Sequence, residues 1–428
     1  MTERTSLDRE LTTYLEGRST NRAPAGLLET ALTRVEATPQ RPAWLLVGRR
    51  LADRLPQAWP PPVSARVVLA IALLVALVIG AIVAAGSQKR LPPPFGLARS
   101  GALVVAFGGH IGVMRPDGTG LTMLTSGPAM DSNPVWSPDG TRFAFTAYQD
   151  DSSILVVMDA DGGHRITLAD RLSGGAANFG PQVGLSWSPD SSRIAFSARI
   201  GDEPEQRIYV TDADRPDATP VGGPDLYALS PSWSPDGTQI AFKRIYPCCG
   251  GQPDSLWLIG PDGSSLHQLS AATGTREELL ETAWSPDGKR LAFLAPGTKL
   301  NDDIFVINAD GTGETNITHS IEDEYGPSWS PEGTRLAFSR VALGSSTLGT
   351  GVFVVNADGT HLVQVVTGAT GVTNPFWSPD GSRILGYVDG GLLSGANSIA
   401  VLDPTGRDPP HDISLPGAGS ASWQRLAP

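Results

Sequence analysis

The clearest pattern in the chain is a run of alternating apolar and polar positions that returns every 45 to 51 residues. Each unit opens with a Trp and a Ser-Pro-Asp-Gly segment, which a first alternating stretch such as TRFAFT follows. A second stretch such as ILVVMD, a short turn such as DADGG and a third stretch such as RITL complete the unit. Alternation over four to eight residues, bounded by Gly, Pro and Asp, is typical of β-strands with one buried face. Counting the short segment that holds the Trp, each unit is predicted to form four strands.

Four antiparallel strands repeated at this interval are typical of the blades of a β-propeller. The repeat Trp residues are Trp136, Trp187, Trp233, Trp284, Trp329, Trp377 and Trp423. Residues 102–125 contain three strand segments without a Trp strand, whereas Trp423 has a strand segment with nothing after it. We therefore predict an all-β fold of seven four-stranded blades, with one blade shared by both ends of the propeller so that no strand edge is exposed. The alternative is six blades with an unpaired C-terminal strand.

The WSPDG segment is interpreted as a structural element. Proline presets φ, Asp bonds to nearby main chain and Gly accepts positive φ, which suits a tight turn between two strands. Ser191 replaces the Gly in one unit and Glu332 replaces the Asp in another. A turn tolerates both changes, whereas a catalytic role would require the same carboxylate geometry in every unit. The Trp before the turn has a large apolar face that is expected to fill the space between neighbouring blades.

These repeats resemble those of TolB and related periplasmic proteins, which are WD-repeat-like propellers. The segments NPVWSPDGTRFAF and DIFVINADGTGETNIT carry the resemblance, which extends over roughly residues 100–425. It implies the propeller fold and leaves the function open, because propellers serve many roles. TolB itself is regarded as six-bladed, so seven blades depart from the family pattern.

Residues 67–86 form an uncharged apolar stretch of twenty residues. At 1.5 Å per residue a helix of this length spans about 30 Å, the thickness of a bilayer core. A secretory signal peptide would lie nearer the N-terminus. We predict a short helical cytoplasmic region (1–62), a transmembrane helix (63–88), a Pro-rich linker (89–99) and an extracytoplasmic propeller (100–428). Arg residues before the span slightly outnumber the Lys and Arg after it, which favours this orientation.

The N-terminal region is similar in position to the cytoplasmic part of membrane-anchored anti-sigma factors. The zinc-binding type is excluded, because no His precedes His110 and no Cys precedes Cys248. An anti-sigma-like transmembrane signalling protein therefore stays open as an alternative function.

The charge distribution argues against nucleic acid as a partner. The net charge is −12, although residues 1–66 contain ten Arg against seven Asp and Glu, so the propeller region is strongly acidic. Binding to phosphates depends on Lys and Arg. The two cysteines, Cys248 and Cys249, are adjacent and exclude a disulfide framework or a four-Cys zinc site.

The loops of a propeller open on two faces, and here one face is expected to carry only tight turns. The other face has long, irregular loops, where binding residues tend to lie. We expect this face to bind a protein, peptide or glycan in the bacterial cell envelope. The candidate binding residues are Tyr148, Asp150, Asp151, Tyr246, Asp302, Asp303, Glu322, Asp323, Glu324 and Tyr325.

No cofactor is expected, and calcium is the one metal that the acidic loops suit. Its candidate ligands are in residues 301–303 and 212–217, neither of which has the complete spacing of an EF-hand loop. The chain has no G-x-S-x-G, Walker-type or H-E-x-x-H motif. The sequence therefore favours a binding, scaffolding or sensing module over an enzyme. A propeller-based hydrolase or lyase acting on peptide or glycan remains the alternative from another class.

Overall fold

The computed structural model describes residues 95–149, 152–173, 184–201, 206–245, 255–270, 282–297, 301–341, 351–366, 371–389, 398–409, 411–413 and 418–426. The chain divides into two compact units, Met1–Gln88 and Lys89–Pro428. The predicted helical region and transmembrane helix lie outside the described residues. Within the described ranges, no helix is long and apolar enough to cross a membrane.

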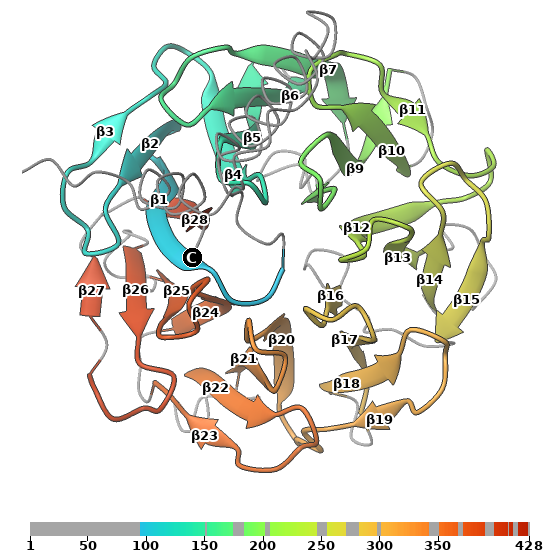
Figure 1. Ribbon diagram of the computed structural model, residues 1–428, viewed down its shortest axis with the longest axis vertical. Helices are drawn as coiled ribbons and strands as arrows, with labels where there is room; N and C mark the ends of the chain where they lie inside the picture. Colours follow the sequence, from blue (N-terminus) through green and yellow to red (C-terminus); the bar gives the residue numbers. More distant parts are fainter. Residues whose placement is uncertain are drawn as a thin grey trace, which may run out of the picture. The chain divides into compact units, whose positions relative to one another are not determined.

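The described part of the second unit is all β, and its strands form antiparallel sheets that follow one another in sequence order (Figure 1). One sheet has the order β28-β1-β2-β3, formed by β28 (Ala418–Leu426), β1 (Arg99–Phe107), β2 (His110–Met114) and β3 (Thr122–Met123). Four more sheets of four strands are β12 to β15 (Ala228–Trp233, Ile240–Arg244, Ser255–Ile259, His267–Ser270), β16 to β19 (Thr282–Trp284, Arg290–Pro296, Asp302–Asn308, Thr315–Asn316), β20 to β23 (Asp323–Trp329, Arg335–Val341, Gly351–Asn356, Val363–Gln364) and β24 to β27 (Gly371–Trp377, Ile384–Asp389, Ser398–Leu402, His411–Ile413).

The remaining eight strands are joined in one larger sheet. It contains β4 to β7 (Met130–Trp136, Arg142–Gln149, Ser152–Asp159, Ile166–Ser173) and β8 to β11 (Leu185–Trp187, Arg193–Ile200, Arg207–Asp212, Thr219–Pro220). The two sets of four are connected only where Leu172 pairs with Ile200 and Ser173 with Arg199. Each set otherwise has the same order as the four-stranded sheets.

The strand that contains Trp423 completes the first sheet, as the sequence predicts. Leu103 in β1 is paired with Trp423 in β28, and Val104 is paired with Ser422. Gln424 follows this Trp where the other repeats have Ser. Its side-chain oxygen accepts a hydrogen bond from Ala102 N (3.0 Å), and its Nε2 donates to Gly140 O (2.7 Å). The longer side chain thus links β28 both to β1 and to the turn after β4.

The apolar side chains pack between neighbouring sheets. The described residues form seven buried clusters, each of which contains one of the seven repeat Trp residues. Trp329, for example, packs with Leu294 and Val306 of the preceding sheet and with Leu336 of its own sheet. Burial of a large aromatic side chain between two sheets contributes several kcal/mol, about 3–5 by the cost of truncating it. The Trp residues therefore hold adjacent sheets together.

The indole nitrogens add polar contacts between the sheets. Nε1 donates to a main-chain oxygen of the preceding sheet in Trp187 (Val135 O, 3.1 Å), Trp284 (Ser232 O, 3.1 Å), Trp329 (Ala283 O, 3.0 Å) and Trp377 (Ser328 O, 3.1 Å). Each acceptor is the residue immediately before the preceding repeat Trp. The repeat thus specifies the contact between sheets as well as the strands within them.

A bulge shifts the register of the first strand in several sheets. It lies three residues before the Trp, where Asn133, Ser230 and Asn374 have positive φ and a proline follows. Asn is one of the few side chains that tolerate this region. The register changes across each bulge, for example between Ser132 and Val135 against β5. The extra residue turns the start of the strand toward a different set of neighbours.

Candidate functional site

The predicted binding residues that the structure describes lie at the end of the sheets opposite the Ser-Pro-Asp-Gly turns, here called the long-loop face. Asp150, Asp151 and Tyr246 are outside the described residues. Tyr148 is near the end of β5 and is 37% exposed, and Glu322 precedes β20 and is half-buried. The other five are the first residues of β18 (Asp302 and Asp303) and of β20 (Asp323, Glu324 and Tyr325).

These five residues lie in strands rather than in the loops expected from the sequence, and all of them are buried. The exposed fraction is 1% for Asp303 and 0% for Glu324. The strands start earlier than the polar sequence suggests, and neighbouring strands cover their first residues. The structure does bring β18 and β20 together, since the main-chain N–H of Asp302 donates to Asp323 Oδ1 (3.3 Å).

Asp303 is the centre of one polar network at this end of the sheets. Its Oδ1 accepts from Asn301 Nδ2 (2.6 Å) and from Ser320 N (3.1 Å), and its Oδ2 accepts from Asn316 Nδ2 (2.6 Å). Asn301 also donates to the main-chain oxygen of Glu322 (3.2 Å). The bonds from Ser320 N to Asp303 and from Asn301 to Glu322 O fix the segment before β20 against the start of β18.

Glu324 is the centre of a second network. Its Oε2 accepts from Ile304 N (3.2 Å), and its Oε1 accepts from Arg340 through Nη2 (2.7 Å) and Nε (3.0 Å). The guanidinium of Arg340 also lies over the ring of Phe353, 4.5 Å from its centre. Burial raises the pKa of Glu324 to about 7, although the hydrogen bond with Thr318 and the charge of Arg340 act in the opposite direction.

The same pairing occurs at a second repeat. Asp131, like Glu324, lies five residues before its Trp, and Thr125, like Thr318, lies eleven residues before it. The Thr125 hydroxyl donates to Asp131 Oδ2 (2.5 Å) and accepts from Ile111 N (2.8 Å), as Thr318 accepts from Ile304 N (3.1 Å). Burial raises the pKa of Asp131. A Thr eleven residues and an acid five residues before the Trp thus indicate a buried hydrogen-bonded pair that links neighbouring sheets.

The arrangement gives these carboxylates structural partners. Within the described ranges there is no group of three or more His, Cys, Asp or Glu residues able to hold a metal ion. In the calcium candidate 212–217, Asp212 accepts from Arg215 Nη2 (2.8 Å), and Asp217 Oδ1 accepts from Asp212 N (2.9 Å). Those hydrogen bonds lie within the turn and engage the two carboxylates with groups of the same segment.

The long-loop face also exposes large apolar side chains. Met130 is 62% exposed and is the cross-strand neighbour of Tyr148, so the two side chains start from adjacent strand ends. Ile321, beside Glu322, is 57% exposed. Sequence reasoning missed Met130 and Ile321, whose only signal is a large apolar residue in a segment of small and polar ones.

Strands of this kind, packed sheet against sheet around repeat Trp residues and closed by β28, define a β-propeller. The chain matches the TolB β-propeller domain family over residues 107–278 and 277–386 and belongs to that family. A TolB homologue from Chlorobium luteolum is 32% identical over 126 residues, 29% of this chain and 26% of that protein. The chain spans only 24% to 53% of the length of three curated relatives that it matches.

Two solved structures show the same fold with different activities. An oligogalacturonate lyase from Vibrio parahaemolyticus has a TM-score of 0.54 at 13% identity, covering 74% of this chain and 94% of that one. A puromycin-hydrolysing peptidase from Mycobacterium tuberculosis has a TM-score of 0.52 at 15% identity, covering 76% of this chain and 56% of that one. Likeness at this identity concerns the fold alone.

Proposed function

We propose that this protein is a seven-bladed, membrane-anchored propeller that serves as a binding, scaffolding or sensing module in the bacterial cell envelope. Its long-loop face binds the partner, which is a protein, peptide or glycan. Membership of the TolB propeller family supports the fold on which this proposal rests.

The count of seven blades is supported by the packing between sheets. Seven Trp residues each belong to a separate buried cluster, and each cluster draws side chains from two successive sets of four strands. The eight-stranded sheet counts as two blades, because its halves are joined by two residue pairs and have a full cluster between them.

The exposed pair of Met130 and Tyr148 is the observation that carries the binding role. Two large side chains on adjacent strand ends present apolar surface, and Tyr adds a polar group at its tip. Contiguous exposed apolar surface with a polar surround marks interaction sites on soluble domains. A second exposed apolar side chain, Ile321, lies beside the half-buried acidic Glu322 on the same face.

The binding role is tested by a photoactivatable cross-linker in place of Tyr148 in cells. Leu362 is the matched control, because it is similarly exposed (45%) but precedes β23 on the side of the tight turns. We expect discrete cross-linked products from position 148, weakened by Met130→Ser, and none from position 362. Equal products at both positions, or none at 148, would contradict the binding face.

The membrane anchor and its orientation are a separate part of the proposal. The uncharged stretch 67–86 supports a span, and the weak Arg excess before it supports a cytoplasmic N-terminus. In cells with a permeabilised outer layer, an impermeant thiol reagent should label Cys248 and Cys249 while an N-terminal tag stays protected from protease. The reverse pattern would place the propeller in the cytoplasm, with soluble partners. Signalling through one span would require dimerisation or a second protein.

A further inference from the structure

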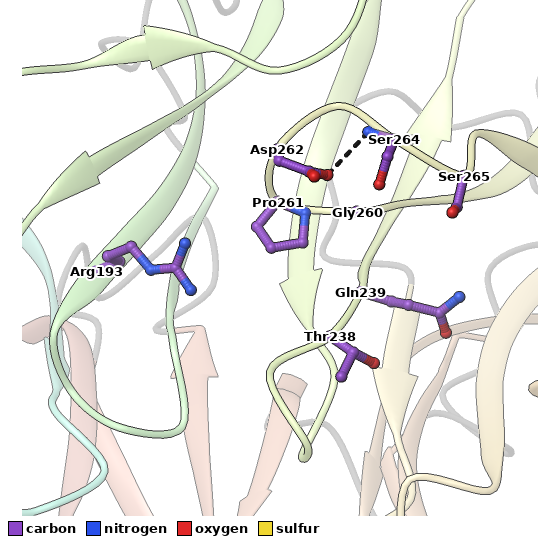
Figure 2. A pocket seen from close by; sticks show the side chains of 8 residues that line it. All are labelled: Arg193, Thr238, Gln239, Gly260, Pro261, Asp262, Ser264 and Ser265. Atoms are coloured by element: carbon purple, nitrogen blue, oxygen red, sulfur yellow. Dashed lines mark hydrogen bonds between the residues drawn. The ribbon is translucent and has the colours of Figure 1, made fainter.

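The end of the sheets that carries the Ser-Pro-Asp-Gly turns, opposite the long-loop face, is here called the turn face. It contains a hollow of 470 Å³ between β9 and the turns of the next sheet (Figure 2). Its polar lining consists of Arg193, Thr238, Gln239, Asp262, Ser264 and Ser265. Arg193 is the first residue of β9, whereas Asp262 and the two Ser residues belong to the turn between β14 and β15. Figure 2 shows the guanidinium on one side of the hollow and the Asp262 turn on the other.

Arg193 belongs to a repeat position, the sixth residue after each Trp. Arginine occurs there five times, and four of the five form a hydrogen bond or an ion pair with protein oxygens. Arg142 bonds to Asp214 (2.5 Å), Arg290 to Gly333 O (3.1 Å) and Arg335 to Glu332 (2.8 Å), while Arg383 forms an ion pair with Asp408 (3.7 Å). Arg193 stacks on Trp233 at 4.8 Å, and its charge acts on the carboxylate of Asp190 in the turn before it, but among the described residues its guanidinium forms no hydrogen bond or close ion pair.

The pair of residues at the equivalent positions one sheet earlier, Arg142 and Asp214, forms an ion pair. Asp214 lies seven residues after the first residue of β10, as Asp262 does after the first residue of β14, and Arg142 reaches Asp214 across the junction between sheets. Arg193 and Asp262 therefore occupy the positions of that ion pair but are separated by the hollow. The Asp262 carboxylate accepts from Ser264 N (3.0 Å), and hydrogen bonds from Ser264 hold its pKa below the usual range. The hollow thus has a guanidinium on one wall and a carboxylate on the other.

We propose that this hollow binds a small zwitterion, an amino acid or a short peptide, whose carboxylate pairs with Arg193 and whose ammonium pairs with Asp262. A guanidinium presents parallel N–H donors that fit a planar carboxylate, and its stacking on Trp233 fixes its plane. A dianion would be repelled by Asp262, and a cation by Arg193. The side-chain amide of Gln239 and the Ser265 hydroxyl are available for polar groups between the two charges. A volume of 470 Å³ is within the range of small-ligand sites, about 300–1,000 Å³.

This site is independent of the long-loop face and holds whether or not that face binds a partner. The test uses the full-length protein and saturation-transfer NMR with four probes. L-serine and glycyl-L-serine carry both charges, whereas N-acetyl-L-serine lacks the ammonium and L-serinamide lacks the carboxylate. We expect saturable binding of the first two and binding weaker by about tenfold or more for the others, since a charge-assisted hydrogen bond contributes about that factor. Tighter binding of serine identifies a free amino acid as the ligand, and tighter binding of glycylserine identifies a peptide.

Two variants assign the binding to this hollow. Arg193→Gln and Asp262→Asn are each expected to weaken serine binding about tenfold. Asp262→Asn leaves the contact between Arg193 and Trp233 intact, so its result stands even if Arg193→Gln unfolds. Arg290→Gln is the matched control, because Arg290 stacks on Trp329 at the same 4.8 Å but lies outside the hollow. The proposal is overturned if neither zwitterion saturates, if the singly charged probes bind equally well, or if Asp262→Asn binds like the unaltered protein.

Discussion

Trp329 donates a hydrogen bond from its indole Nε1 to the main-chain oxygen of Ala283 in the neighbouring sheet, at 3.0 Å. The acceptor is the residue before Trp284, and Trp284 in turn donates to Ser232 before Trp233 (3.1 Å). Arg290 and Arg335, six residues after their own Trp, lie over the Trp rings of the following sheets at 4.8 and 4.6 Å. Trp329 and Trp377 are therefore each held by an apolar cluster, a hydrogen bond and a cation above the ring.

The contribution of this contact is measurable by substitution of Trp329. Trp329→Ala should lower the free energy of unfolding by about 3–5 kcal/mol, because it leaves a cavity between two sheets. Trp329→Phe keeps much of the apolar contact but leaves Ala283 O without its donor, which should cost about 1–3 kcal/mol. Denaturant titration of both variants measures the difference. Equal losses for Phe and Ala would show that the hydrogen bond, not the apolar packing, dominates.

The buried Glu324 predicts a decrease in stability toward alkaline pH. Its pKa is raised from 4.5 to about 7, so between these values the folded state binds more protons than the unfolded state. The stabilisation from the protonated acid is complete below pH 4.5 and is lost as the pH rises through 7. The full amount is roughly 3 kcal/mol.

Urea titrations at pH 5 and pH 8 measure this effect. Glu324→Gln should remove most of the loss between the two pH values, because the amide imitates the protonated acid. Glu314→Gln, in an exposed turn, serves as the control and should keep the pH dependence of the unaltered protein. A pH dependence that persists in Glu324→Gln would assign it to other groups.

The two hydrogen bonds of the Gln424 side chain are expected to hold β28 in the sheet formed by both ends of the propeller. Gln424→Ser restores the residue type of the other repeats but is too short to reach both Ala102 N and Gly140 O. The loss of two hydrogen bonds should cost about 1–3 kcal/mol. Limited proteolysis near residue 426 should become faster in the variant, because β28 opens more often. An unchanged cleavage rate would show that Trp423 and the β1 pairing hold this strand without Gln424.

The Ser-Pro-Asp-Gly turns predict a loss of stability in acid. Ser285 Oγ donates to Asp287 Oδ1 (2.7 Å) and accepts from Arg290 N (2.9 Å). Against the effect of burial, the hydrogen bonds from Ser285 and Lys289 lower the pKa of Asp287 below 3.8. Its stabilisation is therefore present above pH 3.8 and is lost as the pH falls through the lower folded value. Asp287→Asn should flatten the acid limb of a thermal stability profile, and a limb as steep as before would exclude this turn as its cause.

The repeat could be predicted from the sequence because each of its signals is local. A Trp, a proline-containing turn and alternating side chains determine strands within about ten residues, and β5 and β6 lie where the alternation predicts. Trp423 also predicted its pairing with β1, since a lone Trp strand and three strands without one have a single consistent partner. Local propensity and the period of the repeat were sufficient for the strands and their grouping.

The candidate site depended on contacts that no local pattern records. Asp303 and Glu324 have the composition of an exposed acidic loop, but they are buried, with hydrogen bonds from Asn316 of β19, Thr318 before β20 and Arg340 of β21. The same limit applies on the turn face. Arg142 and Arg193 occupy the same repeat position, yet one forms an ion pair with Asp214 and the other borders a hollow. A side chain's type and spacing follow from the sequence, whereas its burial and its partner follow from the distance between sheets, which only the folded chain sets.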